Sequence, residues 1–414
     1  MKKIFSIFII LSIFFSISVE ASAATKTTSA TSSSANTSAT SAASIFVATP
    51  KSFVVTETLH SVKLSWKRNK NATGYIVSRS TDKETWHKVK TIKSNKTVSY
   101  IDNSASEDVL YYYSIKAYKK YNGKTYFSTP ASTVPIYFGV NFYISSYEDN
   151  VALSWQKVAE AKGYEIYFST DSVNFSRIKR IKKNSLTTYT KTELIKPYKT
   201  KYYFYIKVYN VVNNKRNYIY QSETLCSSSI KSLINGSVAK PKSNFKTYNV
   251  QGKKAYMAYK ISITSSDKKI FNDFNSNYLS SDMSPYARIY YTFMFIHKKV
   301  TYASGGLYSK IENSTYADAI FNKRIGQCAQ YNGAMVEYLA NLGFSVKLIW
   351  GYRGTSMNNK WQHFWGQVKL QNGVNYVIET GNYGNDGDWY YFFKPYKETK
   401  KYLKCGKYVS GIKA

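Results

Sequence analysis

The chain has 414 residues, and its 58 Lys and Arg against 24 Asp and Glu give a formal net charge of +34. Three cysteines in a chain of this length exclude a disulfide-rich scaffold, so the domains must be held together by hydrophobic cores. The charge is spread along the chain, because residues 231–414 hold 26 basic and 10 acidic residues, a net of +16.

The first residues have the pattern of a secretory signal. Lys2 and Lys3 precede an apolar run at residues 4–19, and Ala21-Ser22-Ala23 supplies small residues at the spacing of a cleavage site. We predict a signal peptide at residues 1–23, a flexible Ser/Thr/Ala-rich linker at 24–44, and a secreted, extracellular protein that is retained on the cell surface. No later stretch approaches the ~20 apolar residues that span a bilayer, so we expect no transmembrane segment in the mature chain.

An internal repeat follows, with a period of about 90 residues. Leu64-Ser65-Trp66 recurs as Leu153-Ser154-Trp155, and a Gly-Tyr pair follows each Trp eight residues later. Apolar residues alternate within each copy, which is the pattern of strands with one buried face. The repeat therefore predicts two small all-β domains, at residues 45–136 and 137–230.

Three features of the repeat occur together: a Trp in an early strand, Gly-Tyr at the start of the next strand, and Tyr-rich late strands at residues 111–118 and 202–209. In these features residues 46–228 resemble the fibronectin type III family. The resemblance implies two immunoglobulin-like, seven-stranded sandwiches in which Trp66 and Trp155 are core residues. Because neither copy contains Arg-Gly-Asp, we expect these domains to be spacers.

Residues 231–414 show helical spacing instead. Ser284 and Pro285 have the pattern of an N-cap followed by proline at the first helical position, and they predict a helix that ends near residues 297–299. A second helix is predicted to begin near Cys328, because one apolar face is formed by Tyr331, Ala334, Met335, Tyr338, Leu339 and Leu342. Alternating apolar residues at 344–350 then predict a strand.

Cys328 is thus expected at or near the first turn of a helix. The N–H groups and the positive end of a helix favour a thiolate, whereas a cysteine that only packs would fit better within the apolar stripe. The alternative interpretation is a small buried thiol. A disulfide between Cys226 and Cys405, with Cys328 left over, is also open at this point.

His363 is the candidate partner of this cysteine among the four histidines of the chain. Alternation in residues 361–370 predicts a strand that carries His363 on one face. A neutral imidazole can take a thiol proton and return it to a leaving amine. The alternative is a hydrogen-bonded structural histidine, which is the role expected for His60, His87 and His297.

Four features occur in order within roughly residues 284–383: a helix before a Tyr-containing stretch, Gly-x-Cys opening a helix that ends in Leu-Gly-Phe, a His-x-Trp strand, and a strand that ends in an acid. This order resembles the transglutaminase-like domain of the papain-like superfamily, an α+β fold. In that family the Cys attacks an amide carbonyl, the His is its base, and an Asp orients the His. The resemblance implies that Cys328, His363 and Glu379 are the catalytic residues of a domain at residues 231–414, which has an N-terminal extension. Glu379 stands where the family has Asp.

The role of Glu379 depends on the hairpin that follows His363. A two-residue turn would place Glu379 on the face away from His363. A three-residue loop with Gly373 in the left-handed conformation would place it one diagonal step from His363, on the same face. We predict the three-residue loop. In the other register, Asn382 or Asp386 would orient the imidazole.

These features predict a secreted transglutaminase-like cysteine enzyme that acts on amide or peptide bonds through a thioester, as a hydrolase of the peptidase or amidase type. One alternative is a non-catalytic adhesin or wall-binding protein with a transglutaminase-like scaffold, and a second is a cross-linking transglutaminase. No cofactor or metal is expected, because the sequence contains neither HExxH nor CxxC. The expected partners are a protein or peptide substrate and an anionic cell-wall polymer or glycan on the basic surface, and nucleic acid is not expected.

Overall fold

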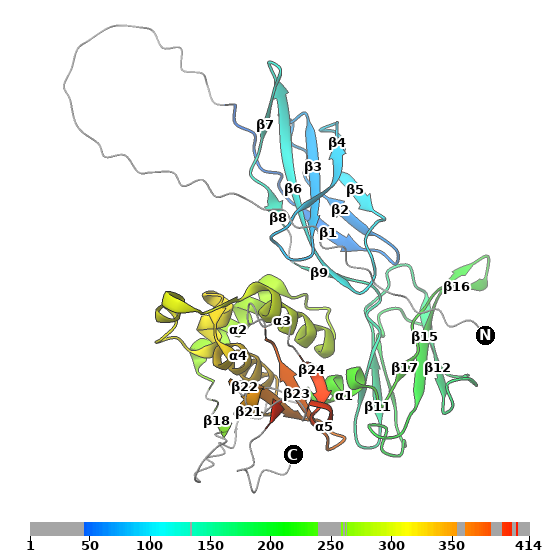
Figure 1. The fold of residues 1–414 in the computed structure, drawn as a ribbon. Helices are drawn as coiled ribbons and strands as arrows, with labels where there is room; N and C mark the ends of the chain where they lie inside the picture. Colours follow the sequence, from blue (N-terminus) through cyan, green and yellow to red (C-terminus); the bar gives the residue numbers. More distant parts are fainter. Residues whose placement is uncertain are drawn as a thin grey trace, which may run out of the picture. The chain divides into compact units, whose positions relative to one another are not determined.

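The computed structural model describes residues 45–132, 135–238, 258–259, 261, 263–353, 361–381, 391–399 and 403–404. The predicted signal peptide and linker lie outside these residues. No helix in the described part is long and apolar enough to cross a membrane. Two β-sandwiches and then an α+β domain follow one another along the chain, which confirms the predicted fold class (Figure 1).

The first sandwich has a three-stranded and a six-stranded antiparallel sheet. The three-stranded sheet has the order β1-β2-β5, with β1 at Val54–Glu57, β2 at Val62–Ser65 and β5 at Ser99–Asp102. The other has the order β4-β3-β6-β7, with β3 at Gly74–Ser80, β4 at His87–Ile92, β6 at Val109–Tyr121 and β7 at Lys124–Phe127. Two short strands, β8 (Ala131–Ser132) and β9 (Ile136–Phe138), also pair with β6.

The second sandwich repeats this strand order. Its three-stranded sheet is β10-β11-β14, with β10 at Tyr143–Ser146, β11 at Val151–Ser154 and β14 at Thr188–Lys191. Its five-stranded sheet has the order β13-β12-β15-β16, with β12 at Gly163–Ser169, β13 at Ser176–Ile181, β15 at Tyr203–Val212 and β16 at Lys215–Gln221. The short β17 (Leu225–Cys226) pairs with β15.

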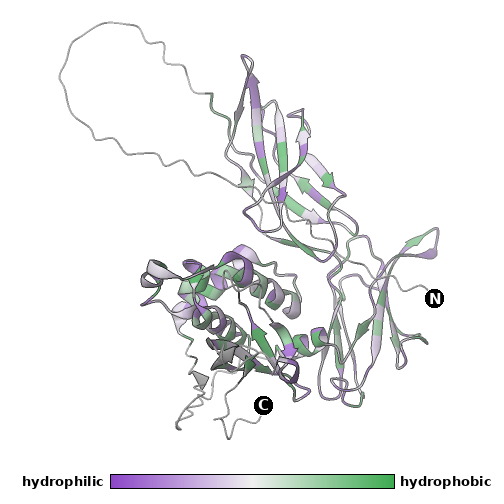
Figure 2. Cartoon of the chain, viewed as in Figure 1, coloured by the Kyte–Doolittle hydropathy of each residue, from purple (hydrophilic) through white to green (hydrophobic). Residues whose placement is uncertain are grey.

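The repeated Trp and Gly-Tyr motifs form equivalent core contacts. Trp66 packs edge-on against Tyr75 with ring centroids 5.2 Å apart, and Trp155 packs in the same way against Tyr164 at 5.1 Å. A Cβ on either glycine that precedes these tyrosines would lie 2.0 Å from a carbonyl oxygen of the neighbouring strand, so only glycine allows the strands to pair there. The prediction that both Trp residues belong to the core is confirmed. Along the strands, apolar and polar residues alternate (Figure 2).

The α+β domain packs α-helices against a sheet whose described strand pairs are antiparallel. Its sheet has the order β18-β21-β22-β23-β24, and β25 also pairs with β21. The strands are β18 (Ala258–Tyr259), β21 (Ser345–Arg353), β22 (Trp361–Lys369), β23 (Asn375–Glu379), β24 (Tyr391–Pro395) and β25 (Leu403–Lys404). The α-helices are α1 (Ile230–Ser237), α2 (Ser265–Tyr278), α3 (Pro285–Lys299), α4 (Cys328–Asn341) and α5 (Tyr396–Thr399). Between α3 and α4 lie β19 (Thr301–Tyr302), a 3₁₀ turn at Gly305–Lys310, a π-helical turn at Asp318–Asn322 and β20 (Ile325–Gly326).

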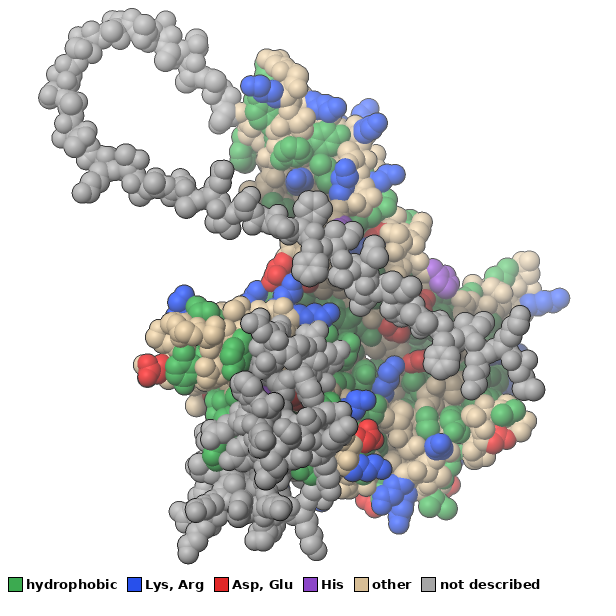
Figure 3. All heavy atoms as spheres, in the orientation of Figure 1, with side chains coloured by type: hydrophobic (Ala, Val, Ile, Leu, Met, Phe, Trp, Pro, Cys, Tyr) green, Lys and Arg blue, Asp and Glu red, His purple; other side chains and the backbone are tan. Residues whose placement is uncertain are grey.

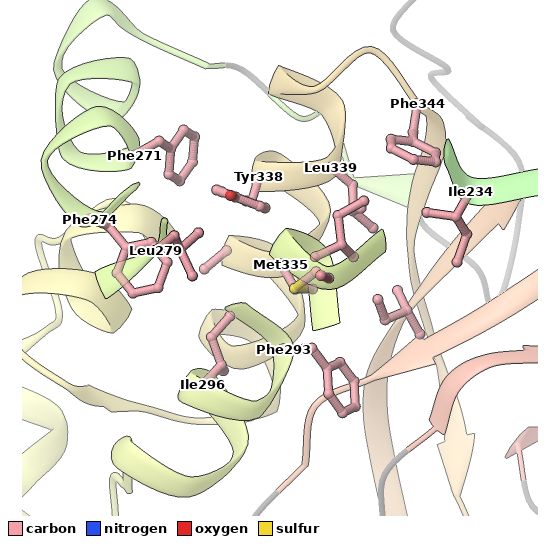
Figure 4. Packing of buried hydrophobic residues seen from close by; sticks show 14 of the residues in the cluster. Ile234, Phe271, Phe274, Leu279, Phe293, Ile296, Met335, Tyr338, Leu339 and Phe344 are labelled. Atoms are coloured by element: carbon pink, nitrogen blue, oxygen red, sulfur yellow. The ribbon is translucent and has the colours of Figure 1, made fainter. Parts of the chain in front are cut away.

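The core of this domain lies between α4, α2, α3 and one face of the sheet. Met335, Tyr338 and Leu339 of α4 are fully buried and belong to one cluster with Phe274 of α2 and Phe293 of α3 (Figure 4). These are residues of the predicted apolar face. Because both predicted helices and the strand after α4 occur where the periodicity places them, the periodicity predictions for this domain are confirmed.

Candidate active site

A short parallel strand pair determines where α4 begins. β19 pairs with β20, and the Ala303 N–H donates to the Gly326 carbonyl at 2.8 Å. Gln327 then fixes the turn into the helix, since its Nε2 donates to the Ala303 carbonyl and its N–H donates to Gln330 Oε1, each at 3.0 Å. Cys328 is the first residue of α4 and is half-buried. Its sulfur therefore lies beside the N–H groups of a helix start.

A close approach of helix and sheet brings the cysteine to the histidine strand. α4 packs on β22 at Gly366, where a Cβ would lie 2.7 Å from a methyl group of Val336 and 2.4 Å from one of Ile378. Any larger residue would push α4 away from the sheet. Glycine at this position therefore allows α4 to hold Cys328 close to β22.

His363 connects the cysteine to an acid. It is 4% exposed, and its Nε2 lies 2.6 Å from Glu379 Oε2, which is itself buried. The His363 ring also lies beside Cys328, and this neighbour helps to raise the pKa of His363. Because Nε2 faces the carboxylate, the nitrogen available to Cys328 is Nδ1. The structure thus brings Cys328, His363 and Glu379 together, with the imidazole between the thiol and the carboxylate.

The charge of Glu379 controls the protonation of His363. Burial by itself would lower the pKa of His363, because it disfavours the charged ring. The negative charge of Glu379, together with hydrogen bonds to Cys328 and Glu379, outweighs burial and raises the pKa to about 9. At neutral pH the ring is an imidazolium, which stabilises a thiolate beside it.

The hairpin between β22 and β23 has the predicted three-residue loop. Leu370 N–H donates to the Val374 carbonyl, and the strands pair from Lys369–Asn375 to Gly366–Ile378. Gly373 has a φ of +79°, the left-handed conformation that this loop requires. The register prediction for Glu379 is therefore confirmed. The alternatives Asn382 and Asp386 lie outside the described residues.

Asn332, one turn after Cys328, was not singled out in the sequence. Its Nδ2 donates to Glu379 Oε1 at 2.9 Å and to the Phe364 carbonyl at 2.8 Å, and its Oδ1 accepts from the Thr380 N–H at 3.0 Å. Asn332 is 1% exposed, so these bonds fix Glu379 from the side opposite His363. A polar residue at position i+4 from the cysteine, beside an apolar stripe, was the signal that could have revealed it.

His297 is a buried, hydrogen-bonded structural histidine, which is the role that the sequence predicts for it. It ends α3, is buried, and its Nδ1 lies 2.7 Å from the Gly381 carbonyl and 3.2 Å from that of Thr380. Both partners are acceptors, so Nδ1 carries the proton. His297 therefore supports the segment that directly follows Glu379.

Among the described residues, no three His, Cys, Asp or Glu side chains gather where they could hold a metal ion. Cys226 and Cys328 are free thiols, and Cys405 lies outside the described residues.

Residues 272–391 match the model of the transglutaminase-like superfamily. This span contains Cys328, His363 and Glu379. The C-terminal part of the chain therefore contains a transglutaminase-like domain. This superfamily consists largely of cysteine-dependent enzymes. No curated protein sequence matches the chain.

Solved structures of fibronectin type III domains are similar to the N-terminal part. The FN1–FN3 domains of chicken CNTN1 are 18% identical, with 43% of this chain and 66% of that chain covered and a TM-score of 0.21. A segment of two fibronectin type III domains from chicken tenascin is 16% identical, with 43% and 96% covered and the same TM-score of 0.21. The assignment of the two sandwiches rests on the strand order described above.

Proposed function

Because residues 272–391 form a transglutaminase-like domain, we propose that the protein is a secreted cysteine enzyme that hydrolyses amide or peptide bonds. Cys328 is its nucleophile, His363 its base and acid, and Glu379 the residue that orients His363. The observation that supports this proposal most strongly is the position of the buried His363 ring, which lies beside Cys328 and has its Nε2 2.6 Å from Glu379 Oε2. A non-catalytic scaffold has no need for a buried imidazolium between a thiol and a carboxylate.

The reaction follows from the positions of these groups. The Cys328 thiolate adds to the carbonyl carbon, and the new oxyanion is stabilised by N–H groups at the start of α4. His363 gives its proton to the leaving amine as the C–N bond breaks, which leaves a thioester on Cys328. Water then attacks the thioester while His363 accepts its proton, and the acid product and thiolate are released.

The same thioester can be attacked by a lysine amine, which would give a cross-link instead of hydrolysis. The test measures both outcomes with one protein substrate, casein, in the presence of a fluorescent primary amine. We expect new chain ends or released ammonia to exceed amine incorporation, and Cys328→Ala to abolish both. Cys226→Ala is the matched control and should keep full activity, because this cysteine lies in the second sandwich.

Other results would favour the alternatives. Amine incorporation that exceeds hydrolysis would identify a cross-linking transglutaminase. Absence of both products, together with an unreactive Cys328, would favour the non-catalytic adhesin.

We further propose that the positive charge retains the secreted protein on an anionic envelope. The net charge of +34 is distributed, and Lys and Arg side chains are scattered over the face seen in Figure 3. Such a surface raises the local concentration of the protein near polyanions.

A further inference from the structure

One face of the second sandwich carries an organised group of cations. Glu165 of β12 has a side chain that is 0% exposed, and its Oε1 accepts from Arg180 at 2.7 Å, Arg177 at 3.3 Å and Arg216 at 3.4 Å. A single carboxylate cannot neutralise three guanidinium groups. The three arginine side chains remain 29–42% exposed, so this excess positive charge is accessible to a ligand.

Tyrosines form a second layer on the same face. The rings of Tyr167 and Tyr205 are stacked, with centroids 4.7 Å apart and an interplanar angle of 10°. The hydroxyls of Tyr167 and Tyr218 donate to Glu165 Oε2 at 3.1 and 2.9 Å. Lys207 Nζ lies 5.1 Å from the centre of the Tyr167 ring. Each phenol oxygen that donates to Glu165 can still accept a hydrogen bond from a ligand.

A shallow groove lies beside this cluster, and it is lined by residues of β13, β15 and β16 and of the segments next to them. Among the described residues that line the groove there is no carboxylate, whereas five are cations: Lys162, Arg180, Lys182, Lys215 and Arg216. Arg180 and Arg216 belong to both the groove and the Glu165 cluster. The two features therefore form one continuous basic surface, which we call the arginine-tyrosine face.

The first sandwich shows that the fold does not require this face. Gly74-Tyr75 and Gly163-Tyr164 begin equivalent strands, so the strand registers give the corresponding positions. Glu165, Arg180, Arg216, Tyr167 and Tyr205 correspond in the first sandwich to Ile76, Thr91, Thr125, Ser78 and Ser114. All five positions are uncharged and non-aromatic in the first copy. The ion pairs of Glu165 and the Tyr167–Tyr205 stack therefore have no equivalent in the first copy, although Arg177, Tyr218 and Lys207 correspond there to Lys88, Phe127 and Lys116.

We propose that the arginine-tyrosine face binds an acidic polysaccharide, a chain of sugars that carry carboxylate groups. Guanidinium groups present paired donors that match a carboxylate, and lysines of the groove add charge along an extended polymer. The tyrosines offer phenol oxygens to sugar hydroxyls.

Other classes of partner fit this face less well. Single-stranded nucleic acid binds by stacking bases on open aromatic rings, but the rings of Tyr167 and Tyr205 cover each other. A protein partner would bury these arginines on contact and would have to supply matching carboxylates, because a buried charge without a partner is strongly unfavourable. The proposal assigns a ligand to a domain otherwise expected to be a spacer, and it is independent of the reaction at Cys328.

The test replaces residues of the arginine-tyrosine face by the residues at the corresponding positions of the first sandwich, in the full secreted chain. The triple variant Glu165→Ile/Arg180→Thr/Arg216→Thr lowers the net charge by one and leaves no buried carboxylate without its partners. The matched control is Lys88→Thr, which removes one charge from β4, the strand equivalent to β13. Binding of polygalacturonate is measured by calorimetry in about 0.15 M salt, with dextran as the uncharged polymer.

We expect the triple variant to lose roughly tenfold or more in affinity for polygalacturonate, because charge-assisted hydrogen bonds are removed. The control should change little, and dextran should not bind. Tyr167→Ser/Tyr205→Ser keeps the charge and should also weaken binding, which provides a second test if the triple variant does not fold. An unchanged rate of Cys328 alkylation shows that the catalytic domain is intact.

Two results would overturn the proposal. Equal losses in the triple variant and in Lys88→Thr would show that only the total charge matters. If oligothymidylate binds as tightly as polygalacturonate and loses affinity equally in the triple variant, the face belongs to nucleic acid. The same result with polyglutamate would assign it to an acidic protein.

Discussion

His363 keeps a positive charge in a buried position because the Glu379 carboxylate lies 2.6 Å from its Nε2. The pKa of the ring rises from the ordinary 6.5 to about 9. A group whose pKa is raised in the folded state contributes stability that is fully present below pH 6.5 and is lost as pH rises through about 9. The thiolate-imidazolium pair should be lost over the same upper range, so we expect activity to fall above pH about 9.

Replacing Glu379 tests the origin of this charge directly. In Glu379→Gln the pKa of His363 should fall by about 1–3 units, because the largest favourable influence on the imidazolium is removed. With only four histidines in the chain, a magnetic resonance titration of labelled histidine rings can follow this shift without a substrate. Glu398→Gln, at an exposed acid of α5, should leave the titration unchanged. An unaltered His363 titration in Glu379→Gln would refute the assignment of Glu379.

Asn332 holds Glu379 on the side opposite His363, so it also affects the His363–Glu379 pair. Asn332→Ala removes the donor to Glu379 Oε1 and the acceptor of the Thr380 N–H, so the carboxylate loses its fixed position. We expect alkylation of Cys328 at pH ~6 to slow by roughly tenfold, together with a lowered pKa of His363. Asn341→Ala, at the other end of α4, is the control. If the variant is less stable but keeps the alkylation rate and the His363 titration, Asn332 has only a structural role.

At the scale of elements, sequence periodicity was enough to predict α3, α4, the strands after α4 and the hairpin register. Each of these depends on local patterns, such as the Ser284 cap or the left-handed Gly373. The partners of Asn332 and His297 could not be predicted, because they lie more than 30 residues away along the chain and come close only through tertiary packing. The Glu165 cluster was missed for a similar reason, since it joins three strands of a domain whose pattern indicated a spacer.

α4 also carries a buried acid that makes stability depend on pH. Glu337 is 5% exposed, and its Oε2 has no hydrogen-bond partner within the described part of the chain. Burial, with a smaller contribution from the charge of Asp267, raises its pKa from 4.5 to about 8. The folded state therefore binds more protons than the unfolded state in this range, and stability falls as pH rises from 4.5 toward about 8.

Glu337→Gln removes this titration and keeps the shape of the side chain. We expect the variant to gain roughly 1–3 kcal/mol relative to the parent protein between about pH 5 and about pH 8. Urea unfolding at both pH values measures the difference, with Glu398→Gln again as the exposed control. A stability difference between variant and parent that is the same at both pH values would contradict the pKa assigned to Glu337.

For the whole molecule, the charge of +34 predicts reversible attachment to anionic surfaces. Salt at about 0.5 M should release the protein from isolated cell envelopes, because exposed charges are then screened within a few ångströms. The triple variant at the arginine-tyrosine face should elute at lower salt than the parent, and Lys88→Thr should not. Retention that persists at high salt would point to a specific, uncharged interaction instead.

We propose that Cys328 is an activated nucleophile, in a domain that follows two sandwiches along the chain. The most direct test of this proposal is alkylation by iodoacetamide at pH ~6, where an ordinary thiol is almost wholly protonated, with the modified cysteines mapped by mass spectrometry. We predict that Cys328 is modified well before Cys226 and Cys405, and that His363→Ala removes this difference. Equal and slow modification of all three cysteines would contradict the enzyme assignment and favour a non-catalytic scaffold.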